Sequence, residues 1–141
     1  MKLTSILSID IGTSSVRACL FDGDGKMLPR TLVKIVHSPT TASDGSVEFD
    51  AGELLLRVED VIDKVLAKAK VAIDAVAMCA FWHGLVGVDD KGKPTTPVLT
   101  WANTRSRDYT QLLKERFNES VVHNRTGAHF HSSFWSAKLL W

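Results

Sequence analysis

The sequence has 141 residues, of which 45% are hydrophobic and 23% are charged, and these values are typical of a globular domain with a packed core. A net charge of +1 with scattered cations gives no reason to expect nucleic acid or an acidic membrane surface as a partner. The sequence shows neither an apolar run long enough to span a membrane nor a secretory signal, and we therefore expect a cytoplasmic protein.

The chain opens on a stretch that predicts a buried strand followed by a turn of small residues. Residues 3–9 form a nearly continuous apolar run that ends on Asp10. The turn that follows consists of Gly12, Thr13, Ser14 and Ser15. Backbone N–H groups and hydroxyls of such a turn can converge on phosphate oxygens, and a neighbouring carboxylate can hold a magnesium ion directly or through water. An ordinary hairpin connection is the alternative interpretation of this composition.

Two further strands and a polar loop come next. Residues 16–21 resume the strand pattern with Arg17 as their one cation, and the DGDG sequence at 22–25 predicts a hairpin turn. Residues 27–36 alternate loosely and predict a third strand antiparallel to the second. The polar segment 37–47 predicts a loop, to which we assign no chemistry.

A helix and a fourth strand complete the first half of the chain. Asp50 and Glu53 have the spacing of a capping box, and the helix is expected to end near Lys70. Its apolar residues share one face: Leu54, Val58, Val61, Ile62, Val65 and Ala69. Residues 71–80 are almost wholly apolar and predict a central strand that is covered on both faces and lies beside the first strand. This order predicts an α/β fold of the ribonuclease H-like type, with a mixed sheet whose first three strands are antiparallel.

Two cysteines fall inside predicted strands. Cys19 and Cys79 have no CxxC partner, and we expect both to be reduced thiols of the core, as in a cytoplasmic protein.

The segment DIGTSSVRACLFD, residues 10–22, resembles the first phosphate motif of the sugar kinase, Hsp70 and actin superfamily. Within that group it is most similar to the opening of FGGY-type carbohydrate kinases. The resemblance implies that Asp10 helps to organise magnesium. It also implies that four residues face the phosphates of ATP: Gly12, Thr13, Ser14 and Arg17.

A second candidate site follows the fourth strand, where open α/β sheets place ligand sites. Here stand Trp82 and His83, and the histidine either makes a structural hydrogen bond or contacts a ligand. In FGGY-type kinases a similar element lines the sugar pocket. The resemblance therefore implies that His83 binds a hydroxyl or carboxylate of the substrate and that Trp82 forms a wall of the pocket.

A third motif follows a hairpin-like excursion at residues 85–99. Where FGGY-type kinases have Trp, one residue, Asp, one residue, Arg, this sequence has Trp101, Asn103 and Arg105. The resemblance implies that these residues bind substrate. The amide of Asn103 cannot supply the negative charge of the usual aspartate, so the alternative is that Trp101 is core and Arg105 a solvated cation.

The remaining chain is expected to contain two helices. Asn103 or Thr104 is expected to cap the first, with an apolar face that consists of Tyr109, Leu112, Leu113 and Phe117. Residues 118–124 are expected to be connecting chain, and Ser132 or Ser133 to cap a helix that begins near Phe134. Lys138, Leu139 and Trp141 reproduce the Lys-Leu-x-Trp element of the family.

The resemblance covers all 141 residues, and it implies the N-terminal part of domain I of an ATP-dependent carbohydrate kinase of the gluconate or xylulose type. ATP and Mg²⁺ are the implied cofactors, and a sugar or polyol is the implied partner. The fold is expected to be incomplete at the C-terminus and the catalytic base to lie beyond Trp141, so that the chain alone is inactive. A C-terminal domain or a second copy would complete it. The alternative is a non-catalytic phosphate-binding, sugar-binding or interaction module with the same fold.

Overall fold

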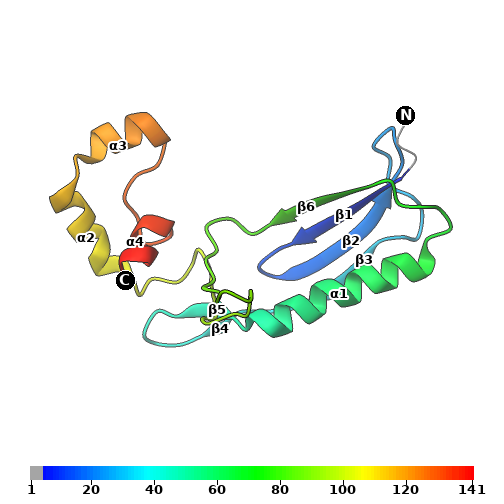
Figure 1. Cartoon of the computed structure of the whole chain (residues 1–141), viewed down its shortest axis with the longest axis horizontal. Helices are drawn as coiled ribbons and strands as arrows, with labels where there is room; N and C mark the ends of the chain where they lie inside the picture. Colours follow the sequence, from blue (N-terminus) through cyan, green and yellow to red (C-terminus); the bar gives the residue numbers. More distant parts are fainter. Residues whose placement is uncertain (1–4) are drawn as a thin grey trace. The chain divides into compact units, whose positions relative to one another are not determined.

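A computed structural model describes residues 5–141 (Figure 1). The chain forms two compact units, Met1–Ser38 with Gly52–Phe81, and Pro39–Ala51 with Trp82–Trp141. The part of the first predicted strand that precedes Ser5 lies outside the described residues.

The first unit contains a four-stranded mixed sheet with the order β3-β2-β1-β6. Its strands are β1 (Ile6–Ile11), β2 (Ser15–Phe21), β3 (Val33–Val36) and β6 (Ala75–Ala80). The first three strands pair antiparallel, whereas β6 pairs parallel with β1. The predicted mixed sheet is therefore confirmed, and so is the place of the fourth strand beside the first.

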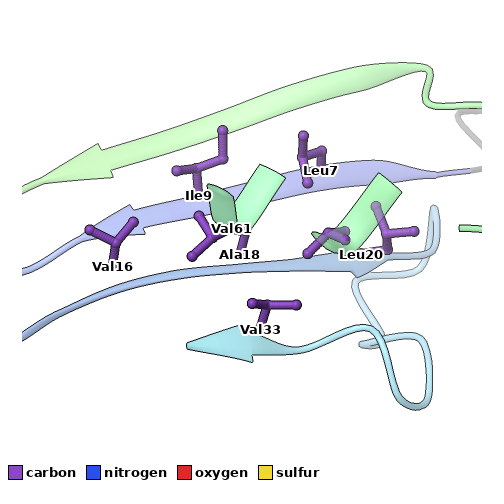
Figure 2. Close-up of a cluster of buried hydrophobic side chains, with 8 residues drawn as sticks. Leu7, Ile9, Val16, Ala18, Leu20, Val33 and Val61 are labelled. Carbon is purple, nitrogen blue, oxygen red and sulfur yellow. The ribbon is translucent and has the colours of Figure 1, made fainter. Parts of the chain in front are cut away.

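Helix α1 (Ala51–Lys68) covers one face of this sheet (Figure 1). Because side chains alternate between the two faces of a strand, every second residue of β1 and β2 points towards the helix. The buried residues are Leu7, Ile9, Val16, Ala18, Leu20, Val33, Val61 and Val65 (Figure 2). All six residues of the predicted helical stripe contribute to this core or pack against it. The stripe predicted from the sequence is therefore confirmed.

Strand β6 differs from the prediction of a strand that is covered on both faces. It is an edge of the described sheet, and five of its six residues are exposed, among them Met78. The prediction that Cys79 is a core thiol is wrong for the same reason, whereas Cys19 in the inner strand β2 is partly buried. An apolar sequence reports that a strand can be buried, but it carries no information about which elements cover it.

Strand β3 is shorter than the predicted strand 27–36. Only Met27 forms an isolated bridge, with Phe21, before the strand begins at Val33. Pro29 lacks an N–H donor, and Arg30 has a left-handed φ of 63°, so the chain turns here and cannot continue a ladder.

The second unit contains a small antiparallel sheet with the order β4-β5-β7. Its strands are β4 (Thr40–Thr41), β5 (Val47–Phe49) and β7 (Val98–Leu99). The prediction of a loop over 37–47 is therefore wrong, because this segment contains β4 and the start of β5. Two isolated bridges, Leu85 with Leu99 and Val88 with Pro94, confirm the hairpin-like excursion that precedes β7.

Three helices follow: α2 (Arg107–Arg116), α3 (Glu119–Thr126) and α4 (Trp135–Leu140). Helix α2 begins after Ser106, so neither Asn103 nor Thr104 caps it, and of its predicted apolar face Leu112 and Phe117 are exposed. Helix α4 begins after Phe134 without a side-chain cap from Ser132 or Ser133. None of the helices described in residues 5–141 combines the length and the apolar character needed to cross a membrane.

Helix α3 replaces the connecting chain predicted over 118–124. The side chain of Asn118 accepts a hydrogen bond from the Val121 N–H at 3.2 Å, and Gly127 ends the helix with a left-handed φ of 73°.

Candidate functional site

In the first unit, Asp10 and Arg17 form a cross-strand pair. They are in register on β1 and β2, and Nη2 of Arg17 lies 2.5 Å from Oδ2 of Asp10. Their side chains are 42% and 48% exposed, respectively, because Asp10 points away from the core that its neighbour Ile9 enters. Strand β1 continues to Ile11, so the carboxylate stands one residue before the end of the strand.

The turn between β1 and β2 is held by backbone contacts and by a histidine. The Gly12 N–H donates to the Ser15 carbonyl at 2.9 Å, and a Cβ at position 12 would come within 3.2 Å of that same oxygen. His37 donates from Nε2 to the Gly12 carbonyl at 2.7 Å and from its backbone N–H to the Ser14 carbonyl at 3.0 Å. Thr13 is half-buried and Ser14 is exposed at the rim of this turn.

The structure thus brings together all five residues of the predicted phosphate motif. An accessible carboxylate, a guanidinium and a fixed small-residue turn offer groups for a cation and for phosphate oxygens. The sequence did not predict a role for His37, because it is only the first residue of a polar segment.

In the second unit, His83 has a tightly defined environment. Its ring stacks on Trp82, with the centroids 4.4 Å apart and the planes at 18°, and it meets the edge of Phe134 at 4.4 Å. Its φ of 62° is left-handed, which is uncommon for a residue other than glycine. Burial lowers the pKa of His83, and the positive charge of Lys138 lowers it further.

Trp82 and His83 line a cavity of about 470 Å³ in the second unit. Its other walls are largely apolar and include Val122, Ala128, Phe130, Phe134 and Trp135. The indole N–H of Trp135 donates to the Gly84 carbonyl at 3.0 Å, which fixes this wall beside the Trp82–His83 segment. The size and the aromatic walls suit a small organic ligand, and His83 offers it a polar contact.

Asn103 and Arg105 form a separate cluster. Asn103 is 1% exposed, and its Oδ1 accepts from the backbone N–H of Arg105 at 3.2 Å and from Nε at 3.4 Å. The Arg105 guanidinium is hydrogen-bonded to Glu48, lies 3.9 Å from Asp44, and stands 4.8 Å from the centroid of a Trp141 ring.

These contacts decide against the alternative of a core tryptophan and a solvated arginine. Trp101 is 52% exposed, whereas the Arg105 side chain is only 23% exposed. Among the residues that the structure describes, Trp101, Asn103 and Arg105 are not part of the cavity wall that contains Trp82 and His83. The Arg105 partner Glu48 was missed because it lies 57 positions away, next to a segment predicted to be a loop.

Comparisons with known proteins agree with this architecture. Residues 5–141 match the sequence profile of the FGGY family of carbohydrate kinases, N-terminal domain. A gluconokinase of Bacillus subtilis (strain 168) is 28% identical over 137 residues, which cover 96% of this chain and 26% of that protein. A glycerol kinase of Geobacter sp. (strain M21) is 30% identical over 143 residues, which cover 96% of this chain and 28% of that protein.

A solved structure shows the same fold. The crystal structure of gluconate kinase from Lactobacillus acidophilus matches 99% of this chain and 28% of its own chain, with a TM-score of 0.87 and 25% identity. This likeness confirms the predicted fold of the actin-like ATPases. The chain spans 26 to 28% of the length of the two curated relatives named above. From the match over residues 5–141 to its N-terminal domain, the chain belongs to the FGGY family of carbohydrate kinases.

Proposed function

We propose that the protein to which this chain belongs is an ATP-dependent kinase that transfers the γ-phosphate to a hydroxyl group of a sugar or polyol, with gluconate or xylulose as the first candidates. The family supports the reaction class. The observation that carries the proposal is the accessible Asp10 carboxylate, held in register with Arg17 beside a fixed turn of small residues. Phosphoryl transfer depends chiefly on placing phosphates and neutralising their charge, and this group of residues offers both.

The first unit is proposed to bind the phosphates of ATP and the metal ion. Four residues face the phosphates in this proposal: Gly12, Thr13, Ser14 and Arg17. Asp10 fits Mg²⁺, which prefers oxygen ligands and takes one or two carboxylates while keeping several waters. Within residues 5–141 no three His, Cys, Asp or Glu side chains gather as a metal cluster, so we assign the ion to Asp10 and the nucleotide phosphates together. When bound, Mg²⁺ neutralises charge that develops on the phosphates.

The second unit is proposed to bind the acceptor substrate. Trp82 offers a flat apolar wall to one face of a sugar, and His83 offers a hydrogen bond to a hydroxyl or carboxylate. Trp101 is exposed and joins this set by family resemblance. Because Arg105 is already paired with Glu48, we assign to Asn103 and Arg105 the shaping of the segment next to Trp101.

We further propose that residues outside this chain provide the catalytic base and most of the adenosine site. Residues 1–141 would then be the N-terminal part of domain I, completed by a C-terminal domain or a second copy and inactive alone. The two cysteines are free thiols, which supports a location in the reducing cytoplasm.

A coupled assay for ADP release tests the proposal on the full-length protein. With ATP and Mg²⁺, we expect turnover with one acceptor from a panel of gluconate, glycerol and pentuloses. The 141-residue chain is expected to give no turnover, and robust turnover would overturn its assignment as an inactive part. A full-length protein that phosphorylates none of the panel would count against the kinase proposal.

A second candidate is a binding module that keeps the fold without catalysis. The exposed apolar residues Val76 and Met78 on β6 favour it, because exposed apolar surface marks interaction sites. Calorimetry with Mg²⁺-ATP and sedimentation of the 141-residue chain separate the two candidates. Nucleotide binding and self-association without turnover of the full-length protein would favour the module.

A further inference from the structure

Lys138 is a buried cation, and within residues 5–141 its ammonium group bonds to backbone carbonyls alone. It is 4% exposed, and its Nζ donates to the Ser132 carbonyl at 3.0 Å and to the Ser133 carbonyl. None of the ion pairs in residues 5–141 includes Lys138, and burial lowers the pKa of its ammonium group. A buried charge is costly unless its hydrogen bonds are satisfied, so an apolar residue would suit a purely structural position on α4 better.

The two carbonyls belong to the turn that places Phe134. The Ser132 carbonyl also accepts from Oγ of Ser106 at 3.1 Å, which ties this turn to the start of α2. Phe134 donates its N–H to the His131 carbonyl at 3.0 Å and accepts from the backbone N–H of Lys138 at 3.4 Å. The Lys138 ammonium group therefore holds the two carbonyls that precede Phe134, whereas its backbone N–H makes a helical hydrogen bond to the Phe134 carbonyl.

Phe134 in turn contacts His83. Its ring meets the imidazole edge to face with the centroids 4.4 Å apart, while Trp82 stacks on the imidazole at the same separation. The histidine has a left-handed φ of 62°, and its ring lies between these two aromatic contacts. Phe134, His83 and Trp82 also line one cavity.

We propose that Lys138 is a positioning residue for the acceptor site, because its ammonium group fixes the Ser132–Ser133 turn that holds Phe134 against His83. The inference rests on the proposed function of Trp82 and His83 as substrate contacts. It gives a role to the lysine of the Lys-Leu-x-Trp element, which the sequence singled out without one. Burial, and after it the charges of Lys138 and His131, keep the pKa of His83 below its ordinary value, so the lysine also acts on this imidazole through its charge.

The test compares three variants of the full-length protein. Lys138→Met keeps most of the side-chain volume and removes the charge and donors, Lys138→Arg keeps the charge and donors, and Lys91→Met changes an exposed lysine of the same unit. We expect Lys138→Met to raise the KM for the acceptor by about ten-fold or more, since small displacements of positioning groups have such effects, with the KM for ATP within about two-fold of the wild type. Lys138→Arg restores the KM at least in part, and Lys91→Met does not change it.

A second measurement does not depend on activity. In NMR titrations of the imidazole resonances, the midpoint of His83 is expected to move upwards in Lys138→Met and to stay low in Lys138→Arg and Lys91→Met. A KM for the acceptor and a His83 midpoint that both stay at wild-type values in Lys138→Met would overturn the proposal. If the wild type itself shows no phosphoryl transfer, the proposed function fails. The His83 midpoint in Lys138→Met then still tests the coupling of Lys138 to His83. A raised midpoint supports this coupling, and an unchanged midpoint overturns it.

A milder change keeps the test decisive if Lys138→Met does not fold. Ser106→Ala removes the second donor to the Ser132 carbonyl and leaves the lysine charge in place. We then expect a higher KM for the acceptor, by about three-fold since one hydrogen bond is lost, with the His83 midpoint unchanged. An unchanged KM for the acceptor in Ser106→Ala would overturn the role of the turn.

Discussion

Replacing Asp10 by asparagine tests whether its carboxylate is needed for turnover or for stability. The side chain takes part in an ion pair with Arg17, but both side chains are close to half exposed, at 42% and 48%. Such exposed pairs contribute about 0.2–1 kcal/mol to stability, because water and salt screen the attraction. Asn is nearly isosteric and keeps the strand pairing, so we expect Asp10→Asn to lower the free energy of unfolding by no more than about 1 kcal/mol.

A residue next to it on the same strand provides the contrast. Ile9 is buried in the core that α1 covers, so Ile9→Ala is expected to cost about 2–5 kcal/mol. Asp63→Asn on the exposed side of α1 is the matched control for loss of one negative charge. It is expected to change neither stability nor turnover.

The decisive comparison is between unfolding and turnover of the same full-length variants. Urea unfolding gives the free energy by linear extrapolation, and the coupled assay gives kcat with saturating ATP and Mg²⁺. We expect Asp10→Asn to abolish turnover while it remains folded. Turnover close to the wild type would remove Asp10 from the metal site, and a loss of stability as large as that of Ile9→Ala would show that the carboxylate is structural.

Three further predictions address other parts of the molecule. The side chains of Arg105 and Glu48 are only 23% and 24% exposed. A double-mutant cycle of Arg105→Met and Glu48→Gln, measured by urea unfolding, should therefore give a coupling energy of about 1–3 kcal/mol. Additive effects of the two substitutions would contradict the ion pair. In the 141-residue chain, a thiol reagent should modify exposed Cys79 faster than Cys19, because burial raises the pKa of the Cys19 thiol; equal rates would contradict this. Burial lowers the pKa of His83 in the folded state. Between that lowered pKa and about 6.5, the unfolded state therefore binds more protons than the folded state. The free energy of unfolding should rise with pH through this window and level off above it. His83→Gln should flatten this pH dependence of urea unfolding, and an unchanged slope would contradict the assignment.

The fold of the first unit could be predicted because its signals are local. The apolar run of β1, the strand pattern of β2, the DGDG turn and the stripe of α1 are each read from one continuous segment of the sequence, and each was confirmed. The exposure of β6 was not predictable, since the same apolar sequence fits an inner strand and an edge strand.

The second unit has weaker local signals. Its strands β4, β5 and β7 have two or three residues each, which is too short for a pattern of alternation. Helix α3 buries none of its residues and therefore shows no apolar stripe. The sequence nevertheless contains signals for both ends of this helix, the N-cap Asn118 and the C-cap Gly127, and these signals could have identified it.

The two candidate binding regions also differ in how local their sequence signals are. The phosphate region depends on residues 10–17 and on one distant side chain, His37, so a short motif is enough to identify it. The His83 region depends on the edge contact between His83 and Phe134, which come from distant parts of the sequence, and no short linear motif contains that contact. A nucleotide is common to many kinases whereas the acceptor varies, and specificity follows from contacts that differ between substrates. Differences in acceptor specificity should therefore arise in the long-range contacts around His83 rather than in the turn beside Asp10.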